Sequence, residues 1–85
     1  FEEGLALAND TAFGLCAGVC TQSLSRATHF RREAQAGLVM VNLPTAGIDY
    51  HVPFGGRRSS SFGPREQGDA ARDFYTQGKT AYIRD

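Results

Sequence analysis

The chain has 85 residues with nine basic and nine acidic side chains, so its formal net charge is zero and nucleic acid is not favoured as a partner. Its 41% apolar content is ordinary for a globular protein, and no apolar run approaches the roughly 18 residues of a membrane span. A chain of this size buries only about 60–65% of its unfolded surface and is marginally stable by itself. Because it opens at Phe1 inside an apparent helix, without an initiator methionine, we expect a piece of a longer protein.

The first half of the chain predicts two strands joined by a helix. Residues 2–8 favour a short helix, and the apolar run 15–21 is typical of a strand covered on both faces. Ser23 is a favourable N-cap for a helix that continues to about residue 35. Residues 38–41 then predict a second buried strand. Strand, helix and strand with short connections form a βαβ unit, so the two strands should be parallel.

The second half predicts a third helix over residues 66–74 and a final strand over residues 79–84. That last segment alternates in the manner of a strand but has no partner nearby in the sequence. We expect it to pair with a distant part of the same protein or with another subunit, because unpaired strand edges seek partners.

Cys16 and Cys20 stand four residues apart in the first predicted strand. At ~3.3 Å per residue they are roughly 13 Å apart. A disulfide requires Cα atoms within about 7 Å, so no bridge is expected. Both cysteines are predicted to be buried, small apolar side chains far from any active centre. Reduced thiols are consistent with a cytoplasmic protein.

Residues 52–68 mix glycines and prolines with aromatic, arginine and serine side chains, a composition that favours an ordered functional loop. Asp49, His51 and the serines 59–61 suggest a hydrolase triad, but the Gly-x-Ser-x-Gly elbow is missing, which argues against that chemistry. The arginines 57 and 58 with these serines suggest a phosphate cradle, although the spacing is not that of a known phosphate loop. A free-standing binding or interaction module that uses the glycine-rich loop 53–68 is the competing hypothesis for the whole chain.

Several short motifs occur in an order and spacing that is specific when they are taken together. They are Asn-Asp-Thr-Ala-Phe-Gly-Leu at 9–15, Ala-Gly-Leu-Val-Met-Val-Asn at 36–42, and Pro-Phe-Gly-Gly at 53–56, followed by Ser60 and Gly63. Over nearly its whole length the chain resembles the C-terminal part of the aldehyde dehydrogenase superfamily. Residues 42–54 and 63–68 are similar to the branch of 2-oxoglutarate semialdehyde (2,5-dioxopentanoate) dehydrogenases.

The resemblance implies an α/β fold, in which residues 1–76 form the C-terminal part of the catalytic domain with its βαβ unit. Within that part, residues 43–64 would form the substrate-pocket loop. Residues 77–85 would be an oligomerisation strand, which implies a homodimer or homotetramer. The remaining partners are then the rest of the dehydrogenase chain and a small-molecule aldehyde, with neither nucleic acid nor membrane involved.

The resemblance also implies the chemistry, which is NAD(P)-dependent oxidation of an aldehyde to the carboxylic acid. Family members attack the aldehyde with a cysteine thiolate, transfer hydride to the nicotinamide, and hydrolyse the thioester with water activated by a glutamate. Both catalytic groups lie upstream of this segment in the family order, so neither Cys16 nor Cys20 inherits the role. NAD or NADP would be bound mainly by the upstream domain, and the 85 residues alone are expected to be inactive.

The substrate tunnel of such an enzyme needs apolar walls and a few polar groups for specificity. We expect Thr45, Ile48, Tyr50 and Phe54 to bind the substrate. Ile48 and Phe54, with Val52, would supply the wall. The polar groups of Thr45, Tyr50 and His51 would bind a distal carboxylate, with Arg57 as a further candidate. An alternative interpretation of Phe54 is that its ring only packs the loop onto the sheet.

Overall fold

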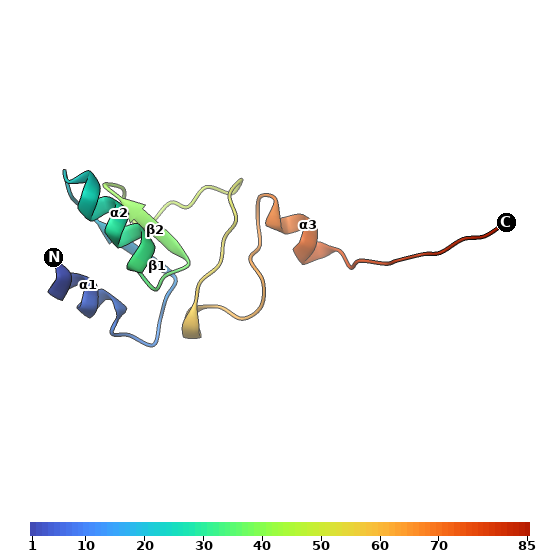
Figure 1. Ribbon diagram of the computed structural model, residues 1–85, viewed down its shortest axis with the longest axis horizontal. Coiled ribbons are helices and arrows are strands. Elements are labelled where there is room, and N and C mark those ends of the chain that lie inside the picture. Colours follow the sequence, from blue (N-terminus) through green and yellow to red (C-terminus); the bar gives the residue numbers. More distant parts are fainter.

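The computed structural model describes all 85 residues and contains the predicted βαβ unit (Figure 1). Strand β1 (Cys16–Val19) and strand β2 (Leu38–Val41) pair in parallel, and helix α2 (Leu24–Glu33) connects them. The register places Cys16 beside Leu38 and Val19 beside Val41. The α/β prediction and the parallel direction of the strands are therefore confirmed.

Helix α2 begins where its sequence predicts. The side-chain oxygen of Ser23 accepts a hydrogen bond from the backbone N–H of Arg26 at 3.3 Å, which is the contact expected of an N-cap. The helix ends at Glu33, slightly earlier than expected, because Ala34 already has an extended backbone with φ −64° and ψ 126°. Helix α1 (Glu2–Asn9) precedes the sheet, close to the predicted range, and has two glutamates in its first turn.

The hydrophobic core lies between the two longer helices and the sheet. A buried cluster contains Leu5 of α1, Phe30 of α2 and Ala34, the residue that follows α2. Ala17 of β1 and Val39 of β2 pack against it. Phe30 is only 4% exposed. Only seven of the 85 residues are buried, so this core is small for the length of the chain.

The second half of the chain is mostly irregular. It contains the short 3-10 helix η1 (Arg58–Ser60) and helix α3 (Ala70–Tyr75). The predicted start of the third helix at residue 66 is wrong. Glu66 instead forms an isolated antiparallel bridge with Phe54, and Gln67 and Gly68 have φ values of 64° and 52°. An α-helix cannot pass through residues in the left-handed region, so α3 begins only after them.

The last ten residues extend away from the rest of the molecule (Figure 1). Tyr82 and Ile83 are 97% and 92% exposed, and the segment pairs with no strand of this chain. Its role as an oligomerisation strand stays a prediction. The radius of gyration is 17.1 Å, compared with about 12 Å expected for a compact domain of this length. None of the helices is long and apolar enough to cross a membrane.

Two backbone segments cross at unusually close range beside the sheet. A Cβ placed on Gly37, the residue before β2, would lie 1.9 Å from the carbonyl oxygen of Gly55 and 2.7 Å from the Cα of Gly56. Both neighbours are backbone atoms, which cannot rotate out of the way as a side chain can. Glycine is therefore required at position 37 by close packing between backbones.

The crossing predicts a large cost for Gly37→Ala in the full-length protein to which the chain is expected to belong. Its free energy of unfolding, measured by denaturant titration, should fall by about 4 kcal/mol or more, since the two backbones must separate. Gly4→Ala is the matched control. Gly4 lies within α1, and a Cβ added there would meet no atom within 4 Å, so alanine should raise stability by about 0.5–1 kcal/mol. Equal stability of the two variants would contradict the crossing.

Candidate functional site

An apolar hollow of about 420 Å³ lies between β2 and the loop that follows it. Leu38, Val39 and Met40 of the strand form one side, and the loop closes the other. Most of the loop lining is apolar, and Asp49 is the one charged residue among it. The loop contributes Leu43, Pro44, Ala46, Gly47, Ile48, Asp49, Val52 and Pro53. An apolar hollow with few polar groups is the usual form of a site for a small organic ligand.

The four predicted substrate-binding residues are not gathered in this hollow. Ile48 lines it and is partly buried. Thr45 is exposed, with its methyl group close to Gly18 of β1. Tyr50 is 84% exposed, and its ring meets the ring of His51 edge to face at 5.6 Å.

Phe54 is partly buried on another side of the loop. It borders a separate, shallower hollow together with Phe62 and Phe74. Its backbone exchanges two hydrogen bonds with Glu66, with N···O distances of 2.6 and 2.8 Å. The lining that sequence reasoning missed includes Met40 and Leu43, because a strand residue and a loop residue carry no local mark of facing a shared cavity.

Asparagine side chains tie the ends of the regular elements together. The amide of Asn42 accepts from the N–H of Thr21 at 2.8 Å and donates to the carbonyl of Thr21 at 2.9 Å. These two side-chain hydrogen bonds join the segments that follow β1 and β2. Asn9 acts likewise at the other end, accepting from the N–H of Gln35 at 2.8 Å and donating to the carbonyl of Glu33 at 3.0 Å.

Ser60 at the end of η1 and Ser61 after it accept hydrogen bonds from backbone amides of the chain itself. The hydroxyl oxygen of Ser60 accepts from the N–H of Gly14 at 2.8 Å, and that of Ser61 accepts from the N–H of Gly56 at 2.7 Å. These amides are the donors that a phosphate cradle would need, and they are already satisfied. The guanidinium group of Arg58 donates to the carbonyls of Asn9 and Thr11. The phosphate cradle is therefore not supported by the geometry, because these serines and Arg58 already bind groups of the chain itself.

The cysteines differ in part from the prediction. Cys16 and Cys20 are both free thiols, so the absence of a disulfide agrees with their predicted separation. The prediction that both are buried is wrong, because Cys16 is only partly buried and Cys20 is exposed. The reason is that β1 ends at Val19 and nothing in this chain covers the residue that follows it. No group of three or more His, Cys, Asp or Glu side chains is arranged to hold a metal ion.

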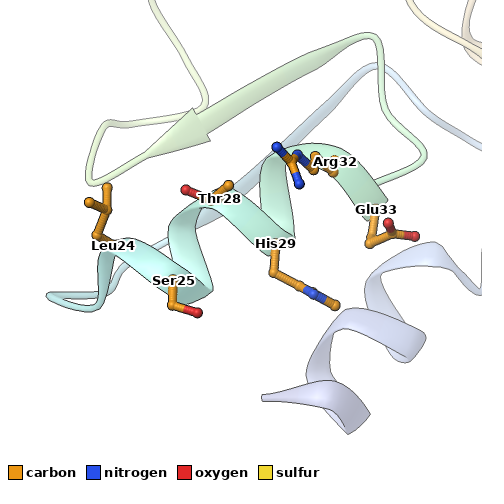
Figure 2. Close-up of a pocket in the computed structure, with 6 residues that line it drawn as sticks. All are labelled: Leu24, Ser25, Thr28, His29, Arg32 and Glu33. Carbon is orange, nitrogen blue, oxygen red and sulfur yellow. The ribbon is translucent and has the colours of Figure 1, made fainter.

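A larger hollow of about 520 Å³ lies on the outer face of α2, and Figure 2 shows its six lining residues on that one helix. Only Leu24 among them is apolar. His29 points from the helix toward α1 (Figure 2), where its Nε2 lies 3.5 Å from a carboxylate oxygen of Glu2. A polar surface on a single helix does not enclose a ligand, so the smaller hollow beside β2 is the better candidate site.

An α/β unit with an apolar hollow bordered by a strand and the loop that follows it is an arrangement suited to holding a small organic ligand. Comparison with known proteins then identifies the class. The aldehyde dehydrogenase family matches residues 1–81, nearly the whole chain. The chain therefore belongs to the aldehyde dehydrogenase family.

Individual relatives agree with this assignment. The alpha-ketoglutarate semialdehyde dehydrogenase of Haloferax volcanii is 54% identical over 96% of this chain, and the alpha-ketoglutaric semialdehyde dehydrogenase of Bacillus subtilis is 46% identical over 98% of it. A solved structure of the indole-3-acetaldehyde dehydrogenase of P. syringae, in complex with NAD⁺, superposes with a TM-score of 0.83 at 42% identity, covering 98% of this chain and 16% of that one. The chain spans about 17% of the length of the two curated relatives.

Proposed function

We propose that the chain works as part of a longer NAD(P)-dependent aldehyde dehydrogenase that oxidises an aldehyde to the carboxylic acid. The observation that carries the proposal is the family match over residues 1–81, together with the apolar hollow that the same residues form beside β2. In this proposal residues 43–54 wall the substrate pocket. The chain supplies neither the catalytic nucleophile nor the base.

The substrate that we propose is 2-oxoglutarate semialdehyde, for which both curated relatives are named. The hollow supplies apolar contact for the carbon chain. Asp49 lines the hollow and would repel a carboxylate inside it. We therefore expect the distal carboxylate outside the hollow, near the exposed residues 50 and 51. Tyr50 and His51 are exposed there and offer hydrogen-bond donors, and Thr45 lies on the same loop.

The nicotinamide cofactor accepts hydride in this family. The backbone amides of Gly14 and Gly56 are not available to the dinucleotide phosphates, since serine hydroxyls occupy them. We therefore propose that NAD or NADP is bound mainly by other parts of the enzyme. The contribution of this chain is to position the aldehyde and to keep water from the reacting carbon, which protects a thioester from premature hydrolysis.

The exposed final segment completes the proposal. Residues 77–85 carry exposed apolar side chains and unpaired backbone groups, so they are suited to pair with another subunit in a homodimer or homotetramer. The competing hypothesis of a free-standing binding module finds no specific support. A two-stranded sheet over a core of five buried apolar side chains leaves many large apolar side chains of the chain exposed.

The direct test is to measure NADH and NADPH production by the full-length protein with a panel of aldehydes. We expect kcat/KM for 2-oxoglutarate semialdehyde to exceed that for betaine aldehyde or aminoacetaldehyde, for which other relatives are named, by roughly tenfold or more. Oxidation of another aldehyde with higher kcat/KM would overturn the substrate and keep the reaction. No oxidation of any aldehyde would overturn the reaction itself.

Two loop substitutions test the pocket wall. Ile48→Ala should lower kcat/KM of the full-length enzyme by an amount equivalent to about 1–3 kcal/mol of transition-state stabilisation, with little change in stability, since Ile48 lines the hollow. Phe54→Ala should have a similar effect if its ring reaches the substrate. Unchanged kcat/KM with a lower melting temperature would instead assign the Phe54 ring to packing beside Phe62 and Phe74.

The cysteines provide a test of where the nucleophile lies. The double variant Cys16→Ala, Cys20→Ala should keep the wild-type kcat per folded molecule, because neither cysteine lines the hollow. Stability should fall by no more than about 1 kcal/mol, since neither side chain is fully buried. Loss of the thioester intermediate in rapid-quench experiments would show that one of these thiols is the nucleophile after all.

A further inference from the structure

Arg65 bridges two backbone carbonyls at the crossing beside the sheet. Its Nη2 donates to the carbonyl oxygen of Gly37 at 2.8 Å, and its Nη1 donates to the carbonyl oxygen of Gly55 at 3.0 Å. Its side-chain stem covers Gly55, where a Cβ would come within 3.0 Å of the Arg65 Cγ. Arg65 is partly buried and forms no ion pair in this chain. The acceptors of its guanidinium group are the two backbone carbonyls.

The two carbonyls belong to residues near the two sides of the apolar hollow. The pocket loop is here residues 43–53, which contain all the loop residues that line the hollow. Gly37 directly precedes β2, which forms one side of the apolar hollow. Gly55 lies two residues after Pro53, the last of the loop residues that line the other side. The start of the loop is held independently, because Asn42 is bound to Thr21. Arg65 and the neighbouring Phe54–Glu66 backbone pair hold its end. The Arg65 contacts are therefore among those that join the segment after the loop to the start of β2.

From this geometry we propose that Arg65 is a positioning residue, which fixes the end of the pocket loop against β2 and thereby sets the affinity for the aldehyde. The inference rests on the proposed function in so far as it concerns the aldehyde. Guanidinium suits the task because its planar, forked donors reach two acceptors at once, whereas a lysine ammonium is a point charge. Hydrogen bonds from charged donors are also the stronger ones.

The test uses the full-length enzyme and the variant Arg65→Ala. Amide hydrogen exchange in residues 43–53 should accelerate roughly tenfold or more, as expected for the loss of a charged hydrogen bond, while exchange in α2 stays unchanged. KM for the aldehyde should rise by a similar factor with little change in kcat. Arg65→Lys should resemble Arg65→Ala, because one ammonium does not replace the two-pronged contact.

Chemical rescue separates positioning from general structural damage. Guanidinium chloride, far below concentrations that unfold proteins, should restore slow loop exchange and low KM to Arg65→Ala, whereas sodium chloride at equal ionic strength should not. Arg72→Ala, which removes an exposed arginine of α3, is the matched control and should leave loop exchange and KM unchanged.

Each outcome bears on the proposal. Unchanged loop exchange in Arg65→Ala overturns the positioning role, whether or not the wild-type protein oxidises an aldehyde. Accelerated exchange in both the loop and α2, without rescue by guanidinium, assigns Arg65 to general stability and also overturns it. Accelerated, rescued loop exchange in a protein that oxidises no aldehyde would support the positioning role and reject only the proposed function.

Discussion

Where the backbone at Gly37 crosses the backbone at Gly55, the two segments approach too closely for a Cβ at position 37. The hydrogen bonds around this crossing explain why it is maintained. The carbonyl of Gly14 accepts from the N–H groups of Gly37 and Arg57, each at 2.9 Å. Three segments that are distant in sequence therefore meet at one point. The sheet starts on one side of that point, and the pocket loop ends on the other.

The family motifs in this sequence supply most of the residues that hold distant backbone segments together. Asn9 and Asn42 bind backbone groups across the chain, and Gly14, Gly37 and Gly55 occupy positions of close backbone approach. Ser60 satisfies an amide that no backbone carbonyl reaches. These residues fix the architecture, and none of them lines the hollow. The residues that line the hollow lie between Gly37 and Gly55 in the sequence and are not part of the crossing itself.

The separation between residues that fix the backbone and residues that line the hollow is consistent with the proposal that this segment, with its small core, is part of a larger enzyme. Backbone hydrogen bonds hold its segments together, and many of its large apolar side chains are exposed to solvent. The hollow beside β2 is open because it has a wall on two sides only, from the strand and from the loop. Such a segment contributes through shape, by presenting a wall at a fixed place, and the reacting groups belong elsewhere in the proposed enzyme.

The local elements were predictable from the sequence because their signals are local. Ser23 marks the start of α2, the apolar runs mark both strands, and their short connections require a parallel βαβ unit. The family motifs added the class of protein. The absence of a disulfide between the two cysteines also followed from strand geometry alone.

Only the tertiary structure decided which parts of the loop meet. Glu66 was predicted to begin a helix, but its backbone pairs with Phe54, and the positive φ of Gln67 and Gly68 delays α3. Ile48 faces the hollow while Tyr50, two residues later, is exposed, because an irregular loop has no periodicity from which side-chain directions follow. The exposure of Cys20 likewise depends on which segment covers the end of β1. Such contacts join residues far apart in sequence, and local pattern carries no information about them.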